Sequence, residues 1–193
     1  MAFAIDGSVS TLDGQKMEGE IEFAHGGLTV KPSQGAPVVV AASNIALATF
    51  STNVTATQIK GSGNGLFGLY FSGTNFGGTS LIRLDETVDF NWRDHAPILG
   101  MPRDHFSVRW MGELEAPETG NYTIYLRSDE GSRIYFDGRL QCDRWGHRTY
   151  EETNFMVSLK AGERHKLQIE YVDSFGDARA QLSWSTPSMP KTI

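Results

Sequence analysis

The sequence predicts an all-β protein, an antiparallel β-sandwich or barrel that is preceded by a small N-terminal β unit. Short runs of alternating apolar and polar residues recur along the chain, with the period of half-buried strands. Turn dipeptides separate these runs, and the 21 glycines supply the positive φ angles that tight turns require. Alanine-rich helical periods are absent. With 193 residues, 39% of them hydrophobic and 11% aromatic, the chain is long enough to bury a core.

Residues 1–60 are predicted to form the small β unit. Its apolar runs are short and rich in β-branched and aromatic residues, which predicts four or five strands in a curved sheet. These runs are Gly19–Phe23, Leu28–Lys31, Val38–Val40 and Ile45–Phe50. A core built from about 50 residues is marginal, so we expect this unit to lean on its neighbour or on a partner. The run from Gly61 to Gly65 has the composition of a flexible linker.

Residues 64–186 are predicted to form the sandwich, from roughly seven or more strands at short, regular spacing. Alternation is clear in the runs Phe106–Trp110, Tyr122–Arg127, Arg133–Phe136, Phe155–Leu159, Lys166–Tyr171 and Ala180–Trp184. Asp137-Gly138 is a strong two-residue hairpin signal, and Ala161-Gly162-Glu163 predicts a second hairpin. Residues 187–193 contain two prolines and are predicted to be an exit segment.

The stretch Asn121–Trp145 reads as three short strands joined by two tight turns. Its alternation places five residues in the core: Tyr122, Ile124, Leu126, Ile134 and Phe136. The first turn presents two adjacent acids, Asp129 and Glu130, followed by a glycine. We expect this acidic turn to take part in binding.

Charge and targeting signals limit the function classes. The formal net charge of −6 disfavours binding to nucleic acid, and no apolar run approaches the roughly 20 residues of a membrane helix. The first residues lack the pattern of a signal peptide. Two interpretations remain open, an intracellular protein or a piece of a longer secreted or surface protein, and the proline-punctuated exit favours the second. Cys142, the one cysteine, cannot form an internal disulfide.

Many short motifs between residues 65 and 186 occur together in one order. They are Gly68-Leu69-Tyr70-Phe71, Asp89-Phe90-Asn91-Trp92, Phe106–Gly112, Gly120–Thr123, Ser128–Gly138, Asp143–Gly146, Leu167–Tyr171 and Leu182-Ser183-Trp184. As a set they resemble the PA14 domain family, the lectin-like β-sandwiches of toxin protective antigen, adhesins, glycosidases and bacterial surface proteins. The resemblance implies a carbohydrate-binding sandwich without catalytic activity, located extracellularly or at the cell surface beside other domains of its parent chain.

The resemblance also implies a metal site. In the adhesin branch, two neighbouring acids and a later loop hold a calcium ion that grips sugar hydroxyls. The matching positions here are Asp129, Glu130, Asp173 and Asp177, although the adhesins carry paired aspartates and a loop asparagine. Adjacent strand residues face opposite sides, so both turn acids reach one ion only through an unusual turn, such as a cis peptide. A plain turn with solvated acids is the alternative.

Three residues are candidates for sugar contact. Trp145 and Phe175 could offer flat apolar surfaces, and Arg144 is one of several arginines on the polar strand faces. The alternative for Trp145 is a core position, as expected for Trp110 and Trp184. No catalytic residues are predicted, because the His and Glu pairs lack a nucleophile or suitable spacing. Two other functions remain open: a protein–protein interaction module of a larger assembly, and an accessory domain of a glycosidase.

Overall fold

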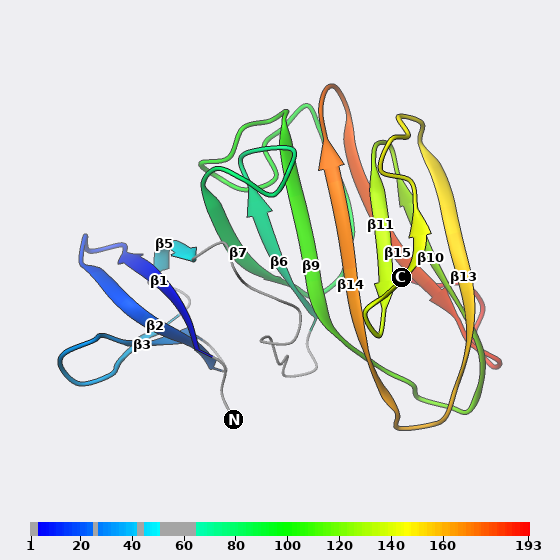
Figure 1. Cartoon of the computed structure of the whole chain (residues 1–193), viewed down its shortest axis with the longest axis horizontal. Helices are drawn as coiled ribbons and strands as arrows, with labels where there is room; N and C mark the ends of the chain where they lie inside the picture. The colour runs from blue at the N-terminus through cyan, green and yellow to red at the C-terminus, as the bar shows by residue number, and fades with distance from the viewer. Residues whose placement is uncertain (1–3, 25–26, 42–44, 51–64) are drawn as a thin grey trace.

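The computed structural model describes residues 4–24, 27–41, 45–50 and 65–193 (Figure 1). The described residues contain strands and turns and no helix, and therefore no helix that could span a membrane. The strands form a five-stranded N-terminal sheet and a sandwich of a four-stranded and a six-stranded sheet. The predicted all-β sandwich is confirmed. Most of the predicted linker, Gly61–Gly65, lies outside the described residues.

The N-terminal unit is an antiparallel sheet in the order β4-β3-β2-β1-β5. Its strands are β1 (Ala4–Thr11), β2 (Lys16–Ala24), β3 (Gly27–Lys31), β4 (Val38–Ala41) and β5 (Ile45–Phe50). Strand β1 was not predicted, because its polar and small residues mask the alternation. It lies between β2 and β5 and pairs antiparallel with both, so that Val9 is opposite Met17 on one side and Ala48 on the other.

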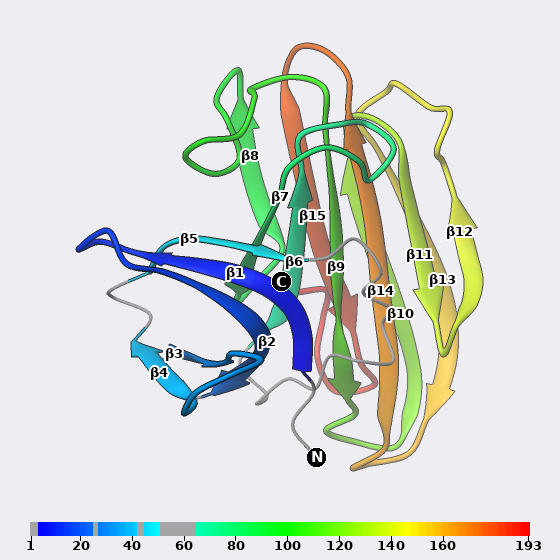
Figure 2. The ribbon, with the colours of Figure 1, turned by 60° about the vertical axis from the view of Figure 1, so that its left-hand side comes forward.

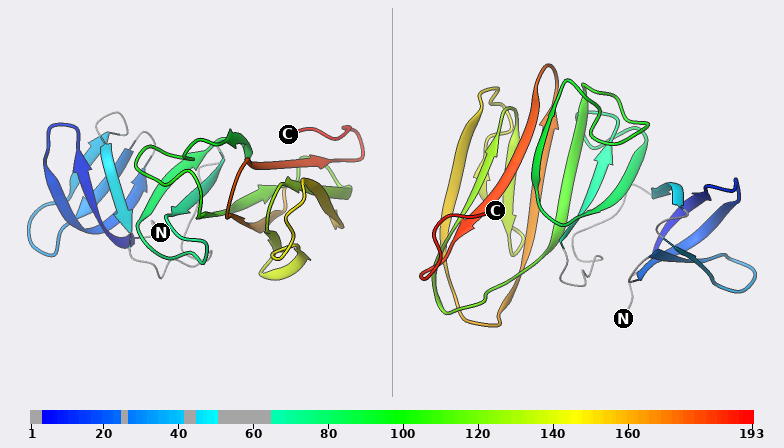
Figure 3. Two further views of the ribbon diagram at one scale, coloured as in Figure 1. Left: turned by 90° about the horizontal axis from the view of Figure 1, so that it is seen from above. Right: turned by 180° about the vertical axis from the view of Figure 1, so that it is seen from behind.

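The sandwich contains ten strands in two sheets. The six-stranded sheet has the order β12-β11-β14-β9-β6-β7, and the four-stranded sheet has the order β13-β10-β15-β8. The bounds are β6 (Leu66–Phe71), β7 (Ser80–Asp85), β8 (Asp89–Arg93), β9 (Phe106–Glu115), β10 (Gly120–Ser128), β11 (Ser132–Phe136), β12 (Arg139–Asp143), β13 (Glu151–Leu159), β14 (Arg164–Asp173) and β15 (Ala178–Ser185). Figures 2 and 3 show the N-terminal unit on one side of this sandwich.

Two predicted hairpin turns have different outcomes. Asp137 and Gly138 have φ angles of 49° and 76°, and Phe136 pairs with Arg139, so this hairpin is confirmed. The hairpin predicted at Ala161-Gly162-Glu163 is wrong, because β13 belongs to the four-stranded sheet and β14 to the six-stranded sheet. Alternation identifies the buried face of a strand but not the sheet that contains it. The Ser128–Gly131 turn also passes from one sheet to the other.

The main core lies between the two sheets of the sandwich. All five residues predicted in this core from the Asn121–Trp145 stretch are buried there. The core also contains a carboxylate, Asp85, which accepts hydrogen bonds from the Tyr70 hydroxyl at 2.6 Å and from Trp110 Nε1 at 2.7 Å. Arg83 forms an ion pair with the same carboxylate. The polar atoms of these two large aromatic residues are therefore satisfied inside the core.

A second apolar cluster joins the N-terminal unit to the outer face of the six-stranded sheet. The N-terminal sheet contributes Val9, Ile21, Leu28, Val30 and Val40, and the sandwich contributes Phe67, Leu69, Phe71 and Met111. The small unit thus completes its core with its neighbour, as expected for a unit of this size. Strand β6 is buried on both faces as a result, and each of its six residues is buried.

This shared cluster predicts that Leu69→Ala strongly lowers the stability of the fold. Leu69 is 3% exposed because the N-terminal unit covers it. Truncation of a buried leucine lowers the free energy of unfolding by about 2–5 kcal/mol, and urea denaturation would measure this loss. Leu140→Ala is the matched control, since Leu140 is 48% exposed on β12 of the same sheet. Equal, small effects of the two substitutions would contradict the shared core.

Candidate functional site

Three loops meet at one end of the sandwich, at its upper edge in Figure 1. The β9–β14 register places Asp173 opposite Phe106, so the loop before β9 adjoins the loop after β14. The Val172 N–H donates to the Gly131 carbonyl at 2.9 Å, which brings the β10–β11 turn to the same end. These contacts gather four carboxylates that we call the acidic cluster. Its members are Asp104, Asp129, Glu130 and Asp173.

Glu130 holds the β14–β15 loop in place. Its side chain is buried, and its carboxylate accepts the backbone N–H of Ser174 at 2.7 Å and that of Phe175 at 3.4 Å. The next residue, Gly131, has no room for a side chain, because a Cβ there would collide with the Trp145 carbonyl oxygen. The turn is therefore packed tightly against two other loops.

Asp129 points to different partners from those of Glu130. Its Oδ1 accepts the Tyr171 hydroxyl at 2.9 Å and the Arg179 backbone N–H at 3.0 Å. Its Oδ2 is buried and has no hydrogen-bond partner in the part of the chain that the structure describes. The described residues contain no cis peptide bond, so the two acids do not converge in the way that we considered from the sequence. The two acids are also not both solvated, as the alternative of a plain turn expects, because Glu130 is buried and Asp129 is half-buried.

Asp173 is the most unusual member of the cluster. It is fully buried, and neither of its carboxylate oxygens has a hydrogen-bond partner among the described residues. Burial, together with the neighbouring charges of Glu130, Asp129 and Asp104, raises the pKa of Asp173 to about 8, against a smaller lowering by the His105 backbone N–H. Burial likewise raises the pKa of Asp129. This raised pKa favours the protonated form of Asp173 at neutral pH.

The structure adds one acid to the predicted set and leaves one out. Asp104 joins the cluster, and its Oδ1 accepts the Gly176 N–H at 3.2 Å. No local pattern distinguishes Asp104, because its position depends on strand register across a long stretch of chain. Asp177 instead forms an exposed ion pair with Arg179, at 2.6 Å.

Of the predicted sugar contacts, Phe175 lies at the acidic cluster. Its ring is 62% exposed and meets the His105 ring edge-on at a centroid distance of 4.4 Å. Trp145 is half-buried outside both apolar clusters, with its ring 5.4 Å from the Phe76 ring and 4.5 Å from the Arg133 guanidinium. It is therefore not one of the core tryptophans. Arg144 is held by Glu151 at 2.8 Å.

The β10–β11 turn thus contacts both segments that carry the aromatic candidates. The Phe175 backbone N–H donates to Glu130, and the Trp145 carbonyl oxygen lies close to Gly131. Within the described ranges, no three His, Cys, Asp or Glu side chains are arranged as a ready metal-binding group. The acidic cluster instead offers three buried carboxylate oxygens without partners, on Asp129 and Asp173.

The raised pKa of Asp173 predicts how stability depends on pH. An aspartate titrates near pH 4 in the unfolded chain, whereas Asp173 titrates at about 8 in the folded chain. The folded state binds the proton more tightly, so the free energy of unfolding falls as pH rises from about 4 to about 8. Asp173→Asn removes this loss. The free energy of unfolding of the variant, relative to that of the wild type, should therefore rise by on the order of 3–4 kcal/mol from about pH 5 to about pH 9.

Urea denaturation at both pH values in the presence of EDTA would measure this gain. The matched control is Asp94→Asn, because the Asp94 side chain is 72% exposed in the loop between β8 and β9. This control should follow the wild-type pH dependence. Parallel pH profiles for the wild type and Asp173→Asn would contradict the assigned pKa.

Comparisons with known proteins identify relatives of this chain. The family model of the PA14 domain matches residues 62–193. The anti-sigma-I factor RsgI3 of Acetivibrio thermocellus is 34% identical over 137 residues, which cover 71% of this chain and 21% of that protein. A solved anti-sigma factor domain-containing protein from Clostridium clariflavum is 25% identical, with a TM-score of 0.66, and the match covers 93% of this chain and 63% of that chain.

A solved PA14 sugar-binding domain from an RTX adhesin shares the fold, with 17% identity and a TM-score of 0.55 over 67% of this chain and 94% of that chain. The present chain spans about a fifth of the length of the curated anti-sigma factor that it matches. The match of the family model extends over most of the chain, including both sheets of the sandwich and the whole acidic cluster. The chain therefore belongs to the PA14 domain family.

Proposed function

We propose that this chain is a non-catalytic carbohydrate-binding module of a larger secreted or cell-surface protein, and that calcium assists binding at the acidic cluster. One observation carries the proposal: three buried carboxylate oxygens without partners lie beside a loop that exposes Phe175. Buried polar atoms normally have partners, and exceptions call for a specific explanation. A bound cation provides one here.

Calcium is the cation that we propose for these oxygens, because it takes six to eight hard oxygens from carboxylates, carbonyls and water. Asp129 and Asp173 would supply only part of such a shell, so water and sugar hydroxyls would supply the rest. Asp129 and Asp173 would hold the ion with their free oxygens, and Asp104 would contribute negative charge. Glu130 would support the loop, since both of its oxygens already accept backbone N–H groups. A bound calcium ion supplies positive charge and open coordination positions for hydroxyl oxygens.

Phe175 is suited to contact a sugar ring. A pyranose presents a C–H face that packs on a flat apolar surface, while its hydroxyls need polar partners nearby. Phe175 provides the flat surface, and the acidic cluster provides the polar groups. The solved relative that is titled a PA14 sugar-binding domain supports carbohydrate as the ligand class.

A second candidate function is a protein-interaction module within a regulatory protein. Two relatives named as anti-sigma factors favour it, and the likeness to one of them extends over the N-terminal unit. The two functions are compatible, because sugar binding could be the signal that such a protein receives. A glycan array probed with and without calcium separates them. No glycan binding at any calcium concentration, with a partner protein recovered by pull-down, would favour the interaction module alone.

Calcium should stabilise the wild-type chain, because it binds the folded state. A calcium concentration of 100 times the Kd adds about 2.7 kcal/mol to the free energy of unfolding. Asp173→Asn should lose this gain, although the same substitution stabilises the chain in EDTA at high pH. Calorimetry and thermal unfolding, with Asp94→Asn as the control that keeps the calcium response, would measure both effects. Flat calcium traces for the wild type would remove the metal from the proposal.

Phe175→Ala should weaken glycan binding about tenfold, which corresponds to about 1.4 kcal/mol. The calcium response should remain, because the Phe175 contact to Glu130 is made by the backbone N–H. Met156→Ala is the matched control, since Met156 is a 78% exposed apolar residue on β13. Titration with the best glycan from the array measures the affinities. Unchanged affinity of Phe175→Ala would place the sugar contact elsewhere.

A further inference from the structure

The sandwich contains a cavity of about 550 Å³ at the end opposite to the acidic cluster. Strands β9 and β14 fix this placement, because Phe106 pairs with Asp173 near the cluster and Glu115 pairs with Arg164 beside the cavity. Ten residues of extended strand separate the two ends by about 30 Å. The cavity is therefore distinct from the proposed sugar site.

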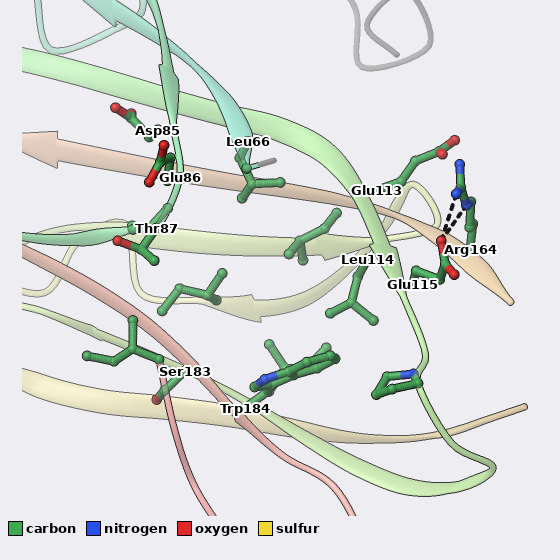
Figure 4. Close-up of a pocket in the computed structure, with 17 residues that line it drawn as sticks. Leu66, Asp85, Glu86, Thr87, Glu113, Leu114, Glu115, Arg164, Ser183 and Trp184 are labelled. Atoms are coloured by element: carbon green, nitrogen blue, oxygen red, sulfur yellow. Dashed lines mark hydrogen bonds and ion pairs between the residues drawn. The ribbon is translucent and has the colours of Figure 1, made fainter. Parts of the chain in front are cut away.

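The cavity walls are aliphatic and come from both sheets (Figure 4). Leu66 and Leu167 line it from the six-stranded sheet, and Ile124 and Leu182 line it from the four-stranded sheet. Trp184 completes the wall and packs on Tyr122 at a ring distance of 5.6 Å. Walls of this kind favour a hydrocarbon group, because sugar hydroxyls would lose their hydrogen bonds to water there.

The rim of the cavity carries excess negative charge. Arg164 forms an ion pair with Glu115 at 2.7 Å, so these two charges offset each other. Glu86 and Glu113 also line the cavity, are exposed, and form no ion pair with any described residue. Lys166, the register partner of Glu113, makes no ion pair with it. Figure 4 places Glu86 beside Thr87 on one side of the cavity, and Glu113 near Arg164 on the other.

Asp85 does not add a free acceptor to this rim. It lines the cavity, but its Oδ2 accepts hydrogen bonds from Tyr70 and Trp110, and its Oδ1 is bound by Arg83. Among the described residues, the rim charges without an ion pair are thus those of Glu86 and Glu113. They repel anions and attract cations to an apolar interior.

We propose that this cavity binds an amphipathic organic cation, an amine with an aliphatic or aromatic body. The hydrocarbon body would lie against the leucines and Trp184, and the ammonium group would lie at the rim with Glu86 or Glu113. The volume is within the range of about 300–1,000 Å³ that small-molecule sites occupy. A fatty acid of the same size would meet the same walls but an unfavourable rim.

The proposal is tested with three probes of equal chain length, namely octylammonium, octanol and octanoate, each titrated below its micelle concentration. Heteronuclear NMR of the full chain would follow the Leu66 and Leu182 methyls and the Trp184 indole N–H. Octylammonium should shift these signals, leave the Phe175 loop unchanged, and bind at least tenfold more tightly than octanoate. Absence of shifts, or equal affinities for the amine and the carboxylate, would overturn the proposal.

Substitutions at the rim separate the contribution of the rim charges to binding from that of the apolar walls. The double variant Glu86→Gln with Glu113→Gln should weaken octylammonium binding at least fivefold and leave octanol binding unchanged. Both positions are exposed, so folding should be unaffected. Glu20→Gln is the matched control, because Glu20 is an exposed acid in the N-terminal sheet. Wild-type affinity of the double variant for octylammonium would also overturn the proposal.

Discussion

Burial of β6 on both faces is the constraint on which the arrangement of the two units depends. Leu66 and Tyr70 face the interior of the sandwich, whereas Phe67, Leu69 and Phe71 face the N-terminal sheet. A strand that is apolar on both sides needs cover on both sides. The sandwich alone covers one, and the N-terminal unit covers the other. Strands β1 to β4, which carry the described contacts, are consequently part of the hydrophobic architecture of the chain.

The acidic cluster combines a well-satisfied carboxylate with unsatisfied ones. Glu130 ties the β10–β11 turn to the β14–β15 loop through backbone N–H groups, whereas Asp173 has no partner for either oxygen. Like charges in a buried space are unfavourable, and such an arrangement is typical of functional sites rather than of structural ion pairs. The scaffold keeps the loops in place, so the free oxygens of Asp129 and Asp173 stay close to the exposed ring of Phe175.

Sequence reasoning succeeded where one strand has one buried face. Tyr122, Ile124 and Leu126 alternate clearly and are buried as predicted. It failed where local pattern carries no long-range information. The turn at Ala161-Gly162 joins strands of different sheets and does not form the predicted hairpin. The acidic turn of Asp129 and Glu130 was singled out from the sequence, and Asp173 was added through the family resemblance. Asp104 is placed by the register of β9 and β14, which no local signal encodes.

The two connections of the sandwich leave it at one end, and this gives the domain a polarity. Strand β6 starts at Leu66, beside Gly112 near the end of β9, and Thr186 follows β15 and bonds Glu118 just beyond β9. The acidic cluster lies at the far end of the same strands. Under the proposed function, a polymer that is gripped there and pulled would load the strands along their length. Tension would then run from the loop end to the end where Leu66 and Thr186 lie.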